Sequence, residues 1–179
     1  MPLPEASAAF INYLRDVRQL SAHTISNYQR DLHSLVDYCS ARQRDDAGAI
    51  HEADIRGWVS QLHRHGLAGS SIQRALSAAR SFFNYLGREQ GHSRNPAAAV
   101  QAPRQPRRLP KTLDADQVNK YLQFAADDPM ALRDSAIAEL FYSSGLRLAE
   151  LVAIDLDDID HPAQLVTVTG KGRKTRTIP

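Results

Sequence analysis

Apolar side chains recur at three- and four-residue steps through the first half of this 179-residue chain, and that spacing predicts amphipathic helices. The clearest run contains Ile25, Tyr28, Leu32, Leu35, Val36 and Cys39. The expected helices pass through residues 5–17, 21–39, 52–65 and 70–86. Ser21 is the expected N-cap of the second helix, and Ser70 with Gln73 forms a capping-box pattern at the fourth. Short loops between such helices predict a four-helix bundle over residues 1–91.

Four prolines interrupt the helical pattern after the bundle and predict an extended linker over residues 92–111. They are Pro96, Pro103, Pro106 and Pro110. The end of this segment is also basic, because residues 101–112 hold no acid and four cations: Arg104, Arg107, Arg108 and Lys111. Such a cluster indicates either contact with a polyanion or a solvated linker, and both readings stay open.

A second domain is expected over residues 112–179. Its expected elements are a helix through 115–126 capped by Asp114, a helix through 131–144 that ends at Gly145, and a β-hairpin through 165–178. The fold class is therefore mainly α with a β-hairpin. The second strand reaches Pro179 with no further element to cover it. We therefore expect this domain to be the incomplete start of an α+β domain in a longer protein.

The polar faces of the second and fourth expected helices carry arginines with short hydroxyl and amide side chains. Their residues are Thr24, Asn27 and Arg30 on the second helix, and Gln73, Arg74, Ser77 and Arg80 on the fourth. This mixture is typical of contacts to phosphates and base edges, whereas a solvated face more often carries Glu and Lys pairs. The sequence therefore makes this face a candidate for DNA binding, with an ordinary solvated face as the alternative.

Arg147 stands in the otherwise apolar or small run "SSGLRLAEL", three residues before Glu150. A guanidinium beside apolar packing is costly unless a carboxylate or phosphate meets it. One reading is a surface ion pair between Arg147 and Glu150 at the start of a helix, which contributes only ~0.2–0.5 kcal/mol. The other is that Glu150 orients Arg147 so that its planar fork grips a phosphate. These residues alone do not decide between the two readings.

Composition excludes several classes of protein. No apolar run approaches the ~20 residues of a membrane span, and the N-terminus lacks the features of a secretory signal, so we expect a cytoplasmic protein without a membrane segment. Cys39, the one cysteine, lies on an apolar helix face and is expected to be a buried thiol. His63 and His65 point to different faces of their helix, so we expect no metal site there. We also expect no cofactor.

Four segments carry a resemblance when they are read in order. They are "LSAHTISNYQRDL", "NPAAAVQAPRQPRRLPKTL", "YSSGLRLAELVAIDLDDID" and "VTVTGKGRKTRTIP". Together they resemble the tyrosine site-specific recombinases of the lambda-integrase family, and within it the chromosome-resolving Xer recombinases. The resemblance covers essentially the whole chain, and its last two motifs are specific as a pair.

The resemblance implies a clamp around duplex DNA, with an N-terminal four-helix, SAM-like core-binding domain, a basic linker and the start of a tyrosine recombinase catalytic domain. Arg147 resembles the active-site arginine that grips the scissile phosphate, with Glu150 behind it, and Lys171 resembles the hairpin lysine that protonates the departing 5′ oxygen. Complete members cut and rejoin DNA through a 3′-phosphotyrosyl intermediate. This sequence has no His-x-x-Arg pair to match the family's, so we expect the chain to bind DNA without cutting it.

None of the tyrosines matches the family's nucleophile, because all lie on expected helices before the hairpin, where packing in the core or in grooves explains them better. They are Tyr13, Tyr28, Tyr38, Tyr85, Tyr121 and Tyr142. The implied partners are a duplex DNA recombination site, a second Xer recombinase in a heterotetramer, and the cell-division DNA translocase, acting in the resolution of chromosome dimers. Two other classes stay open: a non-catalytic DNA-binding module with the same clamp, and a helical protein-interaction adaptor that meets no nucleic acid.

Overall fold

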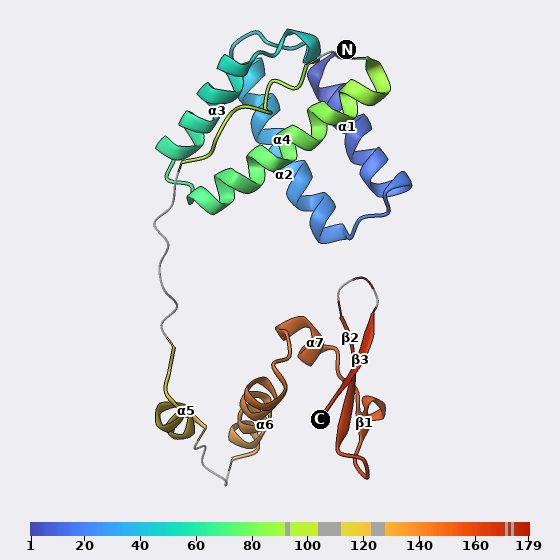
Figure 1. Ribbon diagram of the computed structural model, residues 1–179, viewed down its shortest axis with the longest axis vertical. Coiled ribbons are helices and arrows are strands. Elements are labelled where there is room, and N and C mark those ends of the chain that lie inside the picture. Colours follow the sequence, from blue (N-terminus) through green and yellow to red (C-terminus); the bar gives the residue numbers. More distant parts are fainter. Residues whose placement is uncertain (92–93, 104–111, 123–127, 171, 173) are drawn as a thin grey trace. The chain divides into compact units, whose positions relative to one another are not determined.

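The computed structural model describes residues 1–91, 94–103, 112–122, 128–170, 172 and 174–179. The chain forms two compact units, Met1–Arg108 and Leu109–Pro179 (Figure 1). The predicted domain boundaries, 1–91 and 112–179, stay predictions, since the unit boundary falls between them at a segment outside the described residues.

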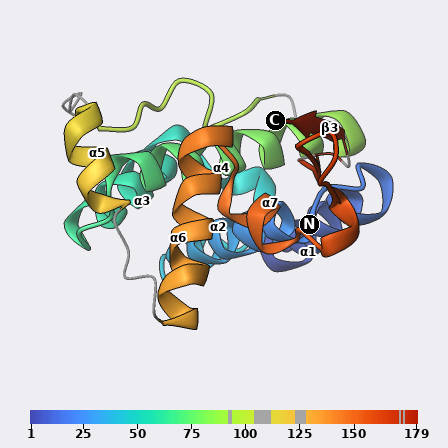
Figure 2. The ribbon, with the colours of Figure 1, turned by 90° about the horizontal axis from the view of Figure 1, so that it is seen from below.

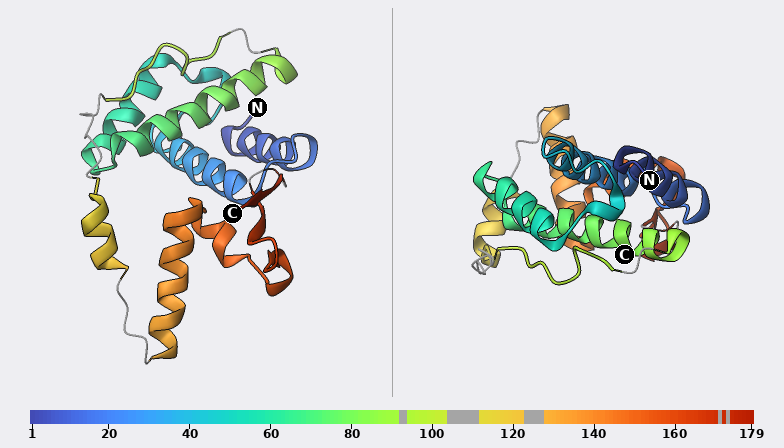
Figure 3. Two further views of the ribbon diagram at one scale, coloured as in Figure 1. Left: turned by 60° about the horizontal axis from the view of Figure 1, so that its bottom comes forward. Right: turned by 90° about the horizontal axis from the view of Figure 1, so that it is seen from above.

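The first unit is built from helices, as the apolar periodicity predicts (Figures 1 and 3). They are α1 (Leu3–Asn12), α2 (Ala22–Ser40), α3 (Glu52–Arg64) and α4 (Gly69–Gln90). A turn of π-helix, Tyr13–Val17, extends α1, and a short 3₁₀ turn, Ala47–Ala49, precedes α3. Helix α4 contacts each of the other three, so the bundle is organised around it.

The two predicted N-caps of this bundle have different outcomes. Ser21 caps α2 as predicted, because its hydroxyl accepts a hydrogen bond from the Thr24 backbone N–H at 3.4 Å. The capping box of Ser70 and Gln73 is wrong: α4 begins at Gly69, and its N-cap is Ala68, which has no side-chain acceptor. The extended backbone of Ala68 starts the helix early and places Ser70 inside its first turn.

Large apolar side chains from all four helices fill the core of the first unit, and Trp58, Phe10, Phe82 and Leu76 are fully buried. The segment after α4 also belongs to this core, since Ala97 and Val100 are buried in it. Part of the predicted linker is therefore packed against the bundle. The remaining, basic part of that linker, residues 104–111, lies outside the described residues.

The second unit contains three helices in its described part and a small antiparallel sheet (Figure 2). The helices are α5 (Ala115–Tyr121), α6 (Pro129–Ser144) and α7 (Leu148–Val152), and a 3₁₀ turn, Leu156–Asp158, follows them. The strands are β1 (Ile159–Asp160), β2 (Leu165–Thr169) and β3 (Thr175–Ile178), in the order β1-β2-β3. The Asp114 cap, the end of α6 at Gly145 and the hairpin β2–β3 are confirmed. Helix α7 agrees with the reading that places Arg147 at the start of a helix, whereas β1 was not predicted.

Many large apolar side chains of the second unit are exposed. The strongly exposed ones include Leu148, Val152 and Leu156, together with Tyr121 and Tyr142. The packing expected for the six tyrosines is therefore right for the four in the first unit and wrong for Tyr121 and Tyr142, because α5 and α6 have no buried residues. Within the described ranges, no helix is long and apolar enough to cross a bilayer.

This difference in burial predicts a difference in stability between the units of the 179-residue chain. Amide protons of α4, which carries nine buried side chains, should exchange with solvent more slowly than those of β2, where one side chain is buried. Hydrogen exchange followed by mass spectrometry measures both segments in one sample. Equal protection of α4 and β2 would contradict the prediction.

Candidate nucleic-acid interface

Arg147 lies at the start of α7, where the turn after α6 puts it in an extended conformation as the N-cap. Gly145 makes that turn possible, because its φ of 59° lies in the left-handed region that glycine adopts without strain. The backbone N–H of Arg147 donates to Oε2 of Glu150 at 2.9 Å, which is one half of a capping box. The other half cannot form, since an arginine side chain has no acceptor.

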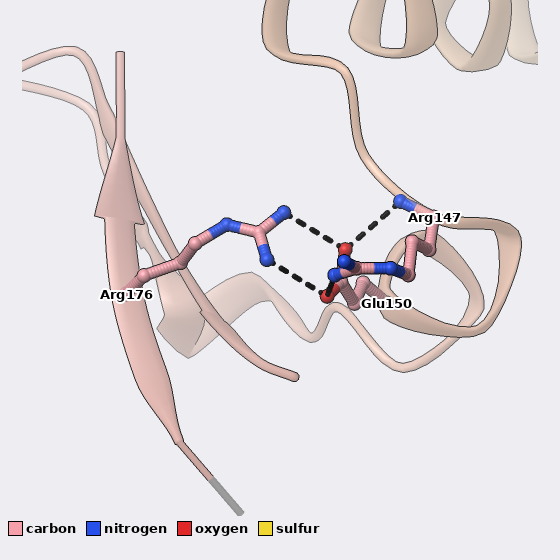
Figure 4. Close-up of polar contacts among 3 residues, drawn as sticks. All are labelled: Arg147, Glu150 and Arg176. Carbon is pink, nitrogen blue, oxygen red and sulfur yellow. Dashed lines mark hydrogen bonds and ion pairs between the residues drawn. The ribbon is translucent and has the colours of Figure 1, made fainter. Parts of the chain in front are cut away.

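Glu150 is the centre of this site and binds two arginines (Figure 4). Its Oε1 accepts from Nη1 of Arg147 at 2.8 Å and from Nη1 of Arg176 at 2.9 Å. Its Oε2 accepts the Arg147 backbone N–H and, at 2.9 Å, Nη2 of Arg176. Arg176 therefore meets the carboxylate fork to fork, while Arg147 meets it with a single nitrogen of its guanidinium.

The side chains of this cluster differ in how far they are buried. The Glu150 side chain is only 4% exposed, whereas that of Arg147 is 69% exposed. The pKa of Glu150 is lowered to about 2, first by the hydrogen bond from the Arg147 backbone and then by the two guanidinium groups, against the opposing effect of burial. The predicted contact between Arg147 and Glu150 exists, but it is not an exposed surface pair. A buried carboxylate that is ionised at neutral pH holds an arginine whose side chain is largely exposed to solvent.

The lowered pKa of Glu150 predicts an acid-dependent loss of stability. Its folded pKa, about 2, lies below the ordinary value of 4.5, so its contribution is complete above pH 4.5 and is lost as the pH falls toward 2. Urea unfolding of the second unit should therefore separate wild type from Glu150→Gln by a constant amount at pH 5–7 and by a shrinking amount below that. A difference that does not change between pH 6 and pH 3 would contradict this assignment.

Arg176 was not predicted as a site residue, although the strand pattern contained a signal for it. In the hairpin register Arg176 stands opposite Val168, whose side chain is buried, and directly opposed residues share one face of a sheet. Arg176 therefore lies on the inward face that Val166 and Val168 define, where a cation needs a partner. Glu150 on α7, which packs beside β2, is that partner.

Gly170, the residue after β2, lies close to the carboxylate of Glu150. A Cβ built on Gly170 would lie 2.9 Å from Glu150 Oε1, which is tighter than side chains tolerate, and its backbone N–H closes the turn onto Lys174 O at 2.8 Å. Lys171, the candidate proton donor, lies outside the described residues, so its role stays a prediction.

The structure brings the two predicted polar helix faces together. Helices α2 and α4 pack side by side, and a pocket of 180 Å³ lies between them. It is lined by Thr24, Asn27, Tyr28, Asp31, Arg74, Ser77 and Ala78. Four of the seven predicted DNA-contact residues of this face therefore line one pocket. Gln73 is exposed next to it, and Arg30 donates to Asn27 Oδ1 at 2.6 Å.

Asp31 is the residue of this pocket that the sequence analysis missed. Its carboxylate is buried and accepts a short hydrogen bond from Nη1 of Arg74. Burial raises the pKa of Asp31, and the contact with Arg74 opposes that rise. The signal was present in the spacing, since Asp31 follows Thr24 by seven residues and so lies on the same helix face. The polar face that α2 and α4 share therefore contains an acid, Asp31, which holds Arg74.

Arg80 is bound by two backbone carbonyls of the segment after α4. Its Nε donates to the carbonyl of Ala97 at 3.1 Å and its Nη2 to that of Val100 at 2.5 Å. These bonds attach the segment after α4 to the bundle and argue against a DNA contact of Arg80, which stays untested. The basic linker residues Arg104, Arg107, Arg108 and Lys111 lie outside the described residues and stay predictions. Within the described ranges, no group of three or more His, Cys, Asp or Glu side chains could hold a metal ion.

Arg74 and Arg80 therefore form a matched pair of variants for DNA binding. Arg74→Ala should weaken binding and reduce the slope of log affinity against log salt by about 0.9, the value for one lost phosphate contact. Arg80→Ala, which removes a cation already bound to protein carbonyls, should leave that slope unchanged. Fluorescence anisotropy with a labelled duplex at several salt concentrations measures both. Equal slopes for Arg74→Ala and wild type would remove Arg74 from the interface.

Comparison with known proteins gives the same family for both units. The model of the "Phage integrase, N-terminal SAM-like domain" matches residues 8–90, and that of the "Phage integrase family" matches residues 111–179. Tyrosine recombinase XerC of Xanthomonas campestris is 45% identical over 95% of this chain, and XerC of Azotobacter vinelandii is 46% identical over 96% of it. These alignments cover 53% and 58% of the two relatives, so the chain spans little more than half of their length.

Solved structures agree on the fold. A lambda integrase dimer bound to a core site is similar over the whole of this chain and 62% of its own, with a TM-score of 0.79 at 21% identity. The Tn1549 transposon integrase in complex with circular intermediate DNA has a TM-score of 0.76 at 17% identity, over 60% of its length. Taken together, the two family models, the XerC relatives and the shared fold show that this chain belongs to the phage integrase family, among its Xer-type tyrosine recombinases.

Proposed function

We propose that these residues form the DNA-binding and phosphate-gripping part of a Xer-type site-specific recombinase. The observation that carries the proposal is the cluster around Glu150, in which a buried carboxylate holds Arg147 by one nitrogen and leaves the rest of its guanidinium exposed. An arginine held this way is preorganised for an anion, because its position is fixed before the anion arrives. The pocket between α2 and α4, with Arg74 held in the same manner by Asp31, supports contact with duplex DNA.

The chemistry of DNA cleavage explains why Arg147 suits this task. When a nucleophile attacks a phosphodiester, negative charge builds up on the two non-bridging oxygens. A planar guanidinium can donate to both oxygens at once, and its charge does not depend on pH. Arg147 has five N–H donors, of which the contact with Glu150 uses one nitrogen. The others can bind the scissile phosphate without breaking the bond that orients the side chain.

For the whole protein we propose the activity of its relatives, which are named tyrosine recombinases. A complete enzyme would cut and rejoin DNA through a 3′-phosphotyrosyl intermediate, with Lys171 protonating the departing 5′ oxygen. Its proposed partners are a recombination site, a second, XerD-like recombinase in a heterotetramer, and the cell-division DNA translocase, in the cytoplasm. A lambda integrase tetramer bound to a Holliday junction has the same fold, which supports an assembly of several protomers on DNA.

Two assays test this function. The 179-residue chain should bind a duplex carrying a Xer recombination site, with an affinity that falls steeply as salt rises. The full-length protein encoded by the gene that carries this sequence should form a covalent complex with a suicide substrate, a duplex nicked so that cleavage cannot be reversed. Binding without a covalent complex would make the protein a DNA-binding module, and the absence of salt-dependent binding would favour a protein-interaction adaptor.

A further inference from the structure

We propose that Arg176 is a positioning residue that keeps Arg147 available for the scissile phosphate by occupying the carboxylate of Glu150. This inference rests on the proposed function. The contact that carries the inference is the fork-to-fork pairing of Arg176 with Glu150.

The Glu150 carboxylate can accept only a limited number of hydrogen bonds. Two carboxylate oxygens offer about four lone-pair positions for hydrogen bonds. All four are used, two by Arg176, one by the Arg147 backbone and one by the Arg147 side chain. Arg147 therefore has no second acceptor on Glu150 to bind, and it is held by one nitrogen only.

Without Arg176, the Glu150 carboxylate would lose two of its hydrogen-bond donors. Two acceptor positions would open on a carboxylate that is 4% exposed, and a buried charge needs compensation. Among the described residues, the other cation already bound to Glu150 is Arg147, at 2.8 Å. Bidentate pairing is the preferred geometry of a guanidinium with a carboxylate, so Arg147 would turn its fork onto Glu150. Its donors would then be occupied by the protein, and the phosphate would have to compete for them.

The surroundings fix Arg176 for this role. Arg176 stands opposite the buried Val168 on the inward face of the hairpin, and its side chain is 39% exposed. Gly170 also lies close to the carboxylate, since a Cβ built on it would lie 2.9 Å from Oε1 and 3.6 Å from Nη1 of Arg176. The carboxylate is thus enclosed between the hairpin and α7. Arg176 neutralises it from one side, and Arg147 projects from the other.

The test is a double-mutant cycle on single-turnover cleavage of a suicide substrate by the full-length protein, at saturating DNA. The variants are Arg176→Met, Arg176→Lys, Glu150→Gln and the double variant Glu150→Gln/Arg176→Met. Methionine keeps the length of the side chain and removes the charge. Thermal unfolding and DNA affinity of each variant serve as controls for folding and occupancy.

We expect Arg176→Met to slow cleavage by about 10- to 100-fold at unchanged DNA affinity, within the range of coupling energies between contacting residues. Arg176→Lys should be intermediate, since it neutralises Glu150 without a fork. The double variant should cleave at least about tenfold faster than Arg176→Met, because an uncharged glutamine no longer captures Arg147. A purely structural role for Arg176 gives no such recovery.

Two results would overturn the inference: a double variant no faster than Arg176→Met, or Arg176→Met cleaving within about threefold of wild type, a difference too small to reflect a captured Arg147. Absence of cleavage by the wild-type protein, in contrast, would refute the proposed function itself. The recovery in the double variant therefore separates failure of the inference from failure of the function on which it rests.

Discussion

Replacing Arg147 with lysine should reduce DNA cleavage by the full-length protein by about 10³- to 10⁵-fold, the range for loss of a charge-stabilising arginine at a phosphoryl-transfer site. Lysine keeps the positive charge but offers a compact ammonium group in place of a planar fork. It cannot donate to Glu150 and to two phosphate oxygens in the same geometry. The measurement is single-turnover cleavage of a suicide substrate, compared with wild type at equal occupancy.

DNA affinity is the internal control for this variant. Lysine keeps the positive charge that neutralises a phosphate, so Arg147→Lys should bind DNA nearly as well as wild type. The loss should therefore appear in the chemical step and not in binding. Cleavage by Arg147→Lys within about threefold of wild type, less than ~0.7 kcal/mol in the barrier, would mean that Arg147 is only a partner of Glu150.

Replacing Trp58 with alanine should destabilise the first unit by roughly 3–5 kcal/mol, the usual cost of removing a large aromatic side chain from a core. Trp58 is fully buried on α3, and its indole N–H donates to Ser34 Oγ on α2 at 3.1 Å. The substitution removes the packing between these helices and leaves a large cavity. The measurement is urea unfolding followed by far-UV circular dichroism, because the variant lacks the one tryptophan of the chain.

Leu67→Ala is the matched control, since Leu67 is an exposed apolar residue of the same unit. It should cost less than about 1 kcal/mol, as surface substitutions usually do. Trp58→Phe should fall between the two variants, because it keeps most of the apolar volume and loses the hydrogen bond to Ser34. A cost for Trp58→Ala no larger than that of Leu67→Ala would show that the bundle is not organised around this core.

The sequence predicted the elements that depend on local patterns. The helices of the first unit follow from apolar periodicity, and the hairpin follows from alternation in β2 and the glycines after it. The start of α4 was predicted at the wrong residue. Ser70 could cap the helix only if its own backbone were extended there, but the extended residue before α4 is Ala68. The start of the short helix α7 at Arg147 agrees with one reading of the sequence, but its extent was not predicted, because five residues give too little periodicity to recognise.

The sites were predicted only in part, because each depends on contacts between distant residues. Arg147 and Glu150 are three residues apart, and their contact could be anticipated. Arg176 lies 26 residues from Glu150, and Asp31 lies 43 residues from Arg74, so neither pair appears in any local window. Arg176 and Asp31 each complete an ion pair in which one charged side chain is buried. A search for charges on faces that periodicity marks as inward would have found Arg176 and Asp31.

The burial of Cys39 has a practical consequence for experiments on this protein. The side chain is fully buried on α2, and burial raises the pKa of its thiol to about 11. At neutral pH only about one molecule in ten thousand would carry the thiolate, which is the nucleophile that attacks maleimide reagents. Cys39 is also the single cysteine of the chain. New cysteines placed on the surface of each unit can therefore carry fluorescent dyes without replacing it, so that energy transfer can follow the two units as DNA is added.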